Sequence, residues 1–582
     1  MAAPARMTAP RARLETDRAR RPRSSEVNEA IAIVDRSGVV PVLSARLDRP
    51  VGRPRSLSVK GLLVAMVLNG LADGHQAQIR AIAATLNALT GQQRRDLGIR
   101  NWDPREAYRR TDRLFNKLAQ ALDDTWSAEV DGHTVTIDGD WLLNRLAPAG
   151  IDPNLPASGA VAVDGTAVPT TARLHFGDAA LAFDGDQTVK EAADQTGSTG
   201  QASTRTVTTF GVGADGRTQW TKDPDARGGY RTATDRKPGG YYVGYELHLG
   251  VAVADLVSTN HVDEISFADQ PPAYVTVASI AAAGTHRGAA TVPALQQVQR
   301  DTGALREVIV DPGYSMLRPE RFLLPLRHAG IDVVFKPVTH QLGRRLIDQH
   351  TITINGQLFS RHTPAELGGE DGQHLALPGH DATPTQRQAS QHQHDRRARF
   401  RLTRHSRPDA DGYARYKCPF CAGLVWNRDL GRRRARKHAP QVALRDHATT
   451  CCSGTTTYDP YTAALHQRIP AGTTAWTASY NRRNRVEMVN GQLKGKFVDL
   501  EAPGFLHVFG RTKRALLLAA TLAGYNAWTA RSHRRKLEAA NAQPARRAKR
   551  RQHAYPATPH SPSAASHTSH SGPDPPRRHP PS

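Results

Sequence analysis

The chain has 582 residues, and its 78 lysines and arginines against 54 aspartates and glutamates give a formal net charge of +24. This length predicts roughly two to four domains with buried cores, and an excess of positive charge in which arginine outnumbers lysine favours nucleic acid as the partner. The same excess could instead serve solubility in the tails. Only four cysteines occur, which excludes a disulfide-stabilised scaffold and favours a reducing compartment.

Residues 1–25 are basic and rich in proline and alanine, which predicts a disordered tail without the apolar centre of a signal peptide. The longest apolar stretch, residues 515–530, is too short and interrupted to span a bilayer and predicts a buried helix. We therefore expect a soluble, intracellular protein with no membrane partner.

Residues 26–150 show helical periodicity. Ser58 is suited to cap the apolar helix that follows it, and residues 79–89 and 108–122 repeat apolar side chains at helical spacing. Paired arginines accompany these segments. A helical domain with a basic face fits the binding of DNA ends, whereas packing or dimerisation fits equally well.

Residues 151–338 change to short strands that alternate with helices, which predicts a mixed α/β sheet. The expected strands are residues 159–164, 241–254, 273–280, 306–311 and 331–338, and the expected helices are residues 293–300 and 321–328. Residues 185–238 are rich in Gly, Thr, Asp and Arg and are expected to form an inserted loop region.

The remainder of the chain divides into three parts. Residues 339–475 break the strand–helix pattern and are expected to form an insertion domain. Helices of the core should resume over residues 476–530. Residues 531–582, rich in Arg, His, Pro and Ser, predict a second disordered basic tail.

Two aspartates, Asp164 and Asp311, each follow a run of apolar β-forming residues and precede Gly or Pro-Gly. An acid at the carboxyl end of a strand lies at the edge of the sheet where α/β proteins usually place their sites. Either aspartate alone is weak evidence, because Asp-Gly and Asp-Pro-Gly are ordinary turn sequences. Asp138 ends another strand-like run and is the alternative first acid.

A third acid stands in an unusual helical segment. If residues 480–494 form one helix, Tyr480, Arg483, Glu487 and Lys494 share a narrow stripe roughly 21 Å long. A carboxylate beside an aromatic ring and two cations suits a metal-binding acid next to a polyanion, although a solvated charged helix is the simpler alternative. Three acids in basic surroundings suggest a pair of Mg²⁺ ions for displacement at phosphorus.

The spacing Y-x2-R-x3-E-x6-K in this segment resembles the signature of one large branch of bacterial insertion-sequence DDE transposases. In the matching order, Asp164 in VAVDGT, Asp311 in VIVDPGYS and Glu487 resemble the three catalytic acids of that family. GYELHLGVAVAD resembles the strand between the aspartates, with Glu246 where the family commonly has a Lys. The resemblance runs from residue 50 to residue 530.

The resemblance implies an RNase H-like mixed sheet flanked by helices, with a large insertion before the last catalytic helix and a helical N-terminal domain. It implies transposition by hydrolysis and strand transfer that depends on two Mg²⁺ ions, with Mn²⁺ as a substitute. Tyr480, Arg483 and Lys494 would contact DNA near the cleaved end. The expected partners are the terminal inverted repeats and the target DNA, bound by a homodimer at the nucleoid in the bacterial cytoplasm. A transposase-derived DNA-binding protein without catalytic activity is the alternative.

All four cysteines lie in the predicted insertion. Cys418 and Cys421 form a C-x2-C pair, and His447 and Cys451 follow about thirty residues later, which is compatible with a tetrahedral structural Zn²⁺ site. Cys452 or His438 could replace one of these ligands. Reduced cysteines without metal are the alternative.

Overall fold

The computed structural model describes residues 21–48, 55–72, 74–172, 174–177, 189–190, 206–212, 218–231, 239–257, 266–369, 377, 382–428, 435–442, 454–502 and 504–553. Residues 1–530 form one compact unit and residues 531–582 a second. None of the described helices is both long and apolar enough to cross a membrane. The predicted tail 1–25 lies almost wholly outside the described residues.

The N-terminal part is helical, as the sequence predicts. It comprises α1 (Ser24–Ser37), α2 (Val39–Leu47), α3 (Val59–Gly70), α4 (Ile79–Ala88), α5 (Gly91–Asp96), α6 (Ala107–Asp123), a hairpin of β1 (Trp126–Val130) and β2 (His133–Ile137), and α7 (Gly139–Ala149). The Ser58 hydroxyl accepts a hydrogen bond from the Gly61 amide at 2.9 Å and so caps α3, because the first amides of a helix have no partner within it.

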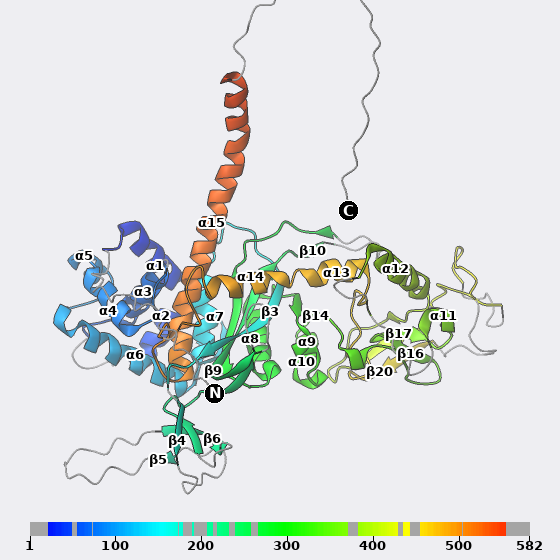
Figure 1. Cartoon of the computed structure of the whole chain (residues 1–582), viewed down its shortest axis with the longest axis horizontal. Helices are drawn as coiled ribbons and strands as arrows, with labels where there is room; N and C mark the ends of the chain where they lie inside the picture. Colours follow the sequence, from blue (N-terminus) through cyan, green and yellow to red (C-terminus); the bar gives the residue numbers. More distant parts are fainter. Residues whose placement is uncertain are drawn as a thin grey trace, which may run out of the picture. The chain divides into compact units, whose positions relative to one another are not determined.

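The central sheet is mixed and runs in the order β12-β9-β3-β13-β14. Its strands β3, β9 and β14 are labelled in Figure 1. Its strands are β3 (Ala160–Pro169), β9 (Gly240–Val253), β12 (Val275–Ala282), β13 (Glu307–Val310) and β14 (Asp332–Phe335). The first three in the chain pair antiparallel, whereas β13 lies parallel between β3 and β14. The mixed α/β sheet is therefore confirmed.

The helices along the sheet come from distant parts of the chain. They are α8 (Arg287–Thr302), α9 (Pro312–Ser315), α10 (Leu323–His328), α13 (Thr474–Asn481), α14 (Asn484–Leu493) and α15 (Arg511–His553). Helix α8 begins earlier than predicted, so Pro293 lies inside it. Helix α15 contains the predicted buried apolar helix and continues past residue 531, which corrects the predicted start of the C-terminal tail.

One hydrophobic core joins the N-terminal helices, the sheet and α15. The Asn144 amide in α7 donates to the Ala278 carbonyl in β12 at 2.8 Å. Helices α3 and α15 cross so closely that a Cβ atom at Gly524 would lie 1.9 Å from the Gly70 carbonyl oxygen. Residues 26–150 therefore share the core of the sheet.

The segment between β3 and β9 is more ordered than a loop region. It contains β4 (Leu174–Gly177), β5 (Val189–Lys190), β6 (Thr206–Val212), β7 (Thr218–Thr221) and β8 (Arg227–Arg231). The first four form a small antiparallel sheet, and β8 pairs with β9. The predicted loop over residues 185–238 is wrong where β5, β6, β7 and β8 lie, and the Thr-rich and aromatic sequences of these strands suit pleated pairing.

The segment between β14 and α13 contains two further small sheets. Its elements are β15 (Arg344–Leu346), β16 (Thr351–Ile354), β17 (Gln357–Ser360), α11 (Ala365–Gly368), α12 (Pro384–Ala398), β18 (Thr403–Arg404), β19 (Ala414–Lys417) and β20 (Thr455–Tyr458). They enclose two apolar clusters of their own.

Candidate active site

Two of the predicted acids lie on neighbouring strands. Val163 of β3 pairs with Val310 of β13 in parallel register, and Asp164 and Asp311 are the next residues along the two strands. Asp311 ends its strand as predicted. Asp164 does not, because β3 continues to Pro169 by pairing with the long strand β9. Asp-Gly at this position is thus part of a strand and not a turn.

Asp138, the alternative first acid, has a structural role. It precedes α7, and its carboxylate accepts a hydrogen bond from the Trp141 amide at 2.7 Å. Such a cap satisfies an amide that has no partner within the helix. The structure therefore favours Asp164 over Asp138 as the partner of Asp311.

The segment that carries Glu487 lies against the same strand. Helix α14 contacts β3 and β9 (Figure 1). The Asn490 amide, one turn after Glu487, donates to the Asp164 carboxylate at 3.1 Å. The other amide atom, Asn490 Oδ1, is buried without a hydrogen-bond partner among the described residues. An acceptor oxygen beside Asp164 is thus left for a further ligand.

The predicted single helix is two helices. Between α13 and α14 the amides of Arg483 and Val486 donate to carbonyls three residues earlier, those of Tyr480 and Arg483, at 2.9 and 3.0 Å. This tighter turn separates Tyr480 in α13 from Glu487 in α14. The Arg483 guanidinium still lies 5.8 Å from the Tyr480 ring centre and 2.5 Å from the Glu487 carboxylate.

Lys494 has an acidic partner of its own. At the end of α14 it forms an ion pair of 3.0 Å with Glu501. Tyr480 stacks on Trp476, with ring centres 4.8 Å apart. Arg483 and Tyr480 therefore interact with the acids, whereas Lys494, seven residues after Glu487 at the end of the same helix, is paired with Glu501.

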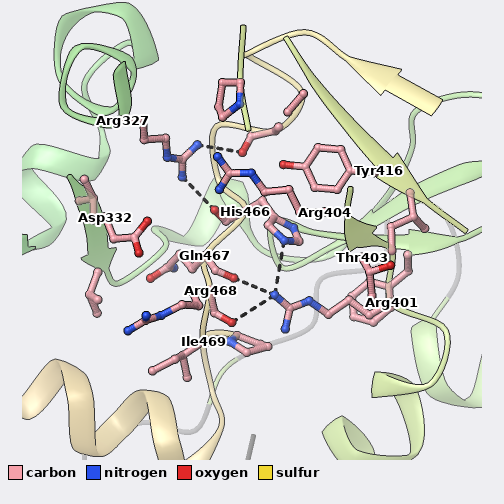
Figure 2. A pocket seen from close by; sticks show the side chains of 18 of the residues that line it. Arg327, Asp332, Arg401, Thr403, Arg404, Tyr416, His466, Gln467, Arg468 and Ile469 are labelled. Carbon is pink, nitrogen blue, oxygen red and sulfur yellow. Dashed lines mark hydrogen bonds between the residues drawn. The ribbon is translucent and has the colours of Figure 1, made fainter. Parts of the chain in front are cut away.

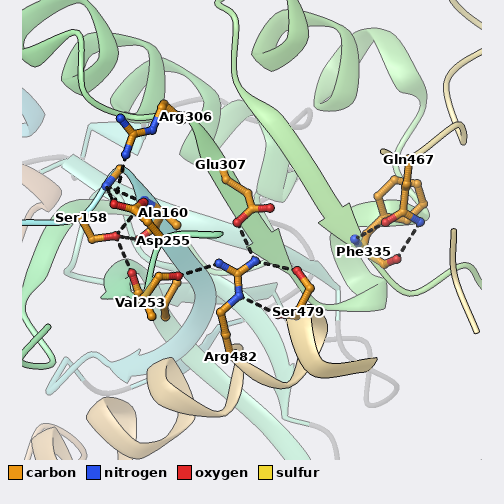
Figure 3. Close-up of polar contacts among 12 residues, drawn as sticks. Ser158, Ala160, Val253, Asp255, Arg306, Glu307, Phe335, Gln467, Ser479 and Arg482 are labelled. Atoms are coloured by element: carbon orange, nitrogen blue, oxygen red, sulfur yellow. Dashed lines mark hydrogen bonds and ion pairs between the residues drawn. The ribbon is translucent and has the colours of Figure 1, made fainter. Parts of the chain in front are cut away.

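Arg482 holds the junction of the two helices against the sheet (Figure 3). Its guanidinium donates to the Ala254 carbonyl at 2.7 Å, to the Ser479 hydroxyl at 2.6 Å and to the Glu307 carboxylate at 2.6 Å. The Arg482 and Glu307 side chains are only 6% and 8% exposed. This buried ion pair fixes the residue immediately before Arg483.

A further acid and a cation border Asp311. Arg287, at the start of α8, lies 3.3 Å from the Asp311 carboxylate and 3.6 Å from that of Glu246 on β9. The Glu246 side chain lies over Gly165. A Cβ atom added to Gly165 would lie only 2.3 Å from Oε1 of Glu246. Glycine at position 165 therefore leaves the space that the fourth carboxylate occupies.

Burial and the charge on Asp311 raise the pKa of Asp164 from 3.8 to about 6. Burial also raises the pKa of Glu246. Both shifts show that the site disfavours further negative charge, as expected where carboxylates gather out of water. A bound cation would relieve this unfavourable charge.

In the structure, the carboxylates of the three predicted acids do not converge on one point. Among the described residues, no three His, Cys, Asp or Glu side chains are arranged to hold a metal ion. Glu487, half exposed, is turned to Arg483. The donor set nevertheless suits Mg²⁺, since Asp164, Asp311 and the unpartnered Asn490 oxygen are hard oxygen ligands.

The predicted zinc ligands are only partly described. Cys418 and Cys421 are buried in a tight turn, where the Ala422 amide donates to the Cys418 carbonyl at 2.9 Å. His447, Cys451 and Cys452 lie outside the described residues, and His438 is exposed. The zinc site stays a prediction.

Sequence reasoning missed the roles of Asn490, Arg287 and Arg482. Asn490 follows Glu487 by three residues, so helical spacing could have placed it on the same face. No sequence pattern predicts the roles of Arg287 and Arg482, because the residues that they contact are distant in the sequence. Comparisons of the chain with protein-family models, curated proteins and solved structures gave no match.

Proposed function

We propose that the protein is a DDE transposase, an enzyme that cuts DNA at the ends of an insertion sequence and joins them to target DNA. One observation carries the proposal. Asp164 and Asp311 follow paired residues of adjacent parallel strands, and the helix that presents Glu487 also donates a hydrogen bond to Asp164. Three acids from distant parts of the sequence thus belong to one region of the fold.

The order of the strands supports an RNase H-like core. The first three strands form an antiparallel meander, and the fourth and fifth extend the sheet in parallel from the first, as such a core requires. The two aspartates then stand on the first and fourth strands, in the middle of the sheet.

Asp164, Asp311 and Glu487 would hold Mg²⁺, with Glu487 leaving Arg483 to do so. Bound Mg²⁺ would supply positive charge to the oxygens of an in-line displacement at phosphorus. The chain itself would orient Asp164 through Asn490 and hold the DNA backbone with Arg483 and Tyr480. Arginine suits this role because its planar fork matches two phosphate oxygens.

The reaction would have two steps. Water adds its oxygen to the phosphorus at the end of the element, and the bond from phosphorus to the 3′ oxygen breaks, which leaves a 3′-hydroxyl and a 5′-phosphate. That hydroxyl then forms a new bond to a target phosphorus and releases a 3′-hydroxyl of the target strand. Double-stranded DNA is thus the proposed partner, and pairing of two ends favours a homodimer.

The test uses Glu487→Gln and the DNA that flanks the gene. We expect this variant to bind the flanking ends as tightly as the wild type and to lose cleavage by at least about 100-fold, the scale of loss when one transition-state contact is removed. Glu320→Gln, at an exposed acid outside the site, is the matched control. Normal cleavage by Glu487→Gln would refute the assignment. Normal binding without any cleavage by the wild type would favour the inactive DNA-binding alternative.

A further inference from the structure

A second site is built along the edge of the central sheet. A cavity of about 740 Å³ lies between β14 and α10 on one side and α12, β18 and β19 on the other (Figure 2). Asp164, Asp311 and Glu487 do not line it. Its chemistry is therefore separate from that of the carboxylate site.

Four arginines line this cavity: Arg327, Arg401, Arg404 and Arg468. Arg327 donates to the carbonyls of Ala463 and His466 at 3.0 and 2.8 Å, and Arg401 donates to the carbonyls of Gln467 and Arg468 at 2.9 and 3.2 Å. In the part of the chain that the structure describes, none of the four forms an ion pair with a carboxylate. Carbonyl oxygens position the guanidinium groups of Arg327 and Arg401 but bring no negative charge to neutralise them.

The acids of the cavity do not balance this charge. Glu307 is already paired with Arg482 at 2.6 Å, so the exposed Asp332 and Asp395 are the remaining lining acids. Four arginines against two aspartates leave an excess of two positive charges. Burial lowers the pKa of Arg327 and of Arg401 to about 10, which keeps both charged at neutral pH.

The wall between the arginines is aromatic and apolar. The rings of Tyr416 and His466 meet edge to face, with centres 5.4 Å apart, and Leu402 and Phe359 also line the cavity. Burial, together with the nearby arginines, lowers the pKa of His466 well below its ordinary value, so this ring is neutral. The aromatic wall can therefore contact a planar group of a ligand, while the arginines of the same cavity contact its negative charge.

We propose that this cavity binds a nucleotide, with its phosphate at Arg327, Arg401 and Arg404 and its base beside Tyr416. Arginine forks match phosphate oxygens, and the volume lies in the range of small-molecule sites. The nucleotide is either free or one residue of a single DNA strand. Neither source requires the carboxylate site.

Calorimetric titration of the full chain in EDTA tests the proposal, with deoxyadenosine monophosphate and a short single-stranded oligonucleotide as probes. Arg404→Gln removes an exposed cation of the cavity, and Ala398→Trp adds a large ring at an exposed lining position. We expect the first to weaken binding roughly 10-fold, as the loss of one charged contact does, and the second to abolish it. Arg300→Gln, an exposed arginine on α8, is the matched control and should bind normally.

The two probes distinguish the sources. Tighter binding of the oligonucleotide, weakened by Arg404→Gln and abolished by Ala398→Trp, assigns the cavity to a DNA strand, whereas binding of the mononucleotide alone assigns it to a free nucleotide. No binding of either probe at about 1 mM, or binding that neither variant changes, overturns the proposal. Melting temperatures identify a misfolded variant, and Arg468→Gln then replaces it. Because the assay contains no divalent metal, its outcome is independent of DNA cleavage.

Discussion

The guanidinium of Arg483 lies 2.5 Å from the carboxylate of Glu487, one helical turn away. This ion pair joins the residue proposed to hold DNA with the third proposed metal ligand. Arg483 also interacts electrostatically with Asp164. In the proposed mechanism, Glu487 would have to leave Arg483 before it could bind Mg²⁺.

The first prediction concerns Arg483→Gln. Without its ion pair, Glu487 becomes available to a metal ion, so affinity for Mn²⁺ in the absence of DNA should rise by up to about 5-fold, as expected for an exposed pair worth up to ~1 kcal/mol. Cleavage of DNA should fall, because a phosphate contact is lost. Calorimetry and a cleavage assay measure the two effects. Unchanged Mn²⁺ affinity would show that Arg483 does not compete with the metal.

The second prediction concerns the pH dependence of stability. The pKa of Asp164 in the folded protein is about 6, above its ordinary 3.8. The protonated carboxyl therefore stabilises the fold below pH 3.8, and that contribution is lost as the pH rises through 6. The difference corresponds to at most ~3 kcal/mol of destabilisation at neutral pH.

Asp164→Asn removes this cost and should be more stable than the wild type at neutral pH, with the gain nearly gone at about pH 4. Urea denaturation at the two pH values measures it, and Asp301→Asn at an exposed acid is the control. Equal stability of Asp164→Asn and the wild type at neutral pH would show that the ionised Asp164 does not destabilise the folded protein.

The third prediction concerns the buried pair of Arg482 and Glu307. Arg482→Met leaves the Glu307 carboxylate buried without its cation, and should reduce the free energy of unfolding by ~3–5 kcal/mol. Adding Glu307→Met should restore part of the loss, because no buried charge then remains. Chemical denaturation of the two variants gives the comparison. If the double variant is no more stable than Arg482→Met, the pair does not act as a unit.

The fourth prediction concerns zinc. If Cys418, Cys421, His447 and Cys451 bind Zn²⁺, the purified protein should contain one zinc per chain, and Cys418→Ser should lose both the metal and thermal stability. Elemental analysis and thermal melting provide the measurements, with chelator-treated wild type as the control. A zinc-free protein in which Cys418→Ser melts normally would end this hypothesis.

Much of the fold was predictable because its signals are local. The cap at Ser58 and the apolar period of residues 79–89 and 108–122 indicate the N-terminal helices from neighbouring residues alone. Asp164-Gly165 was misleading for the opposite reason. Pairing with β9 overrides the local preference of Asp-Gly for a turn, and β9 is distant in the sequence.

The same distinction applies to the site. The strand pattern predicted that Asp311 follows a buried strand, which the structure confirms, whereas the role of Glu487, predicted from the motif spacing, stays a prediction. The break between α13 and α14 was not predictable, since it accompanies the contacts of Arg482 with Ala254 and Glu307. Those residues lie far from Arg482 along the chain, so only the folded sheet brings them together.

The most direct test of the central claim is cleavage of the DNA that flanks the gene, with and without Mg²⁺, by the wild type and by Asp164→Asn, Asp311→Asn and Glu487→Gln. We predict 3′-hydroxyl ends from the wild type only when Mg²⁺ or Mn²⁺ is present, and a loss of at least about 100-fold in each variant. Cleavage by the wild type in EDTA, or by a variant at the wild-type rate, would contradict the assignment of these three acids.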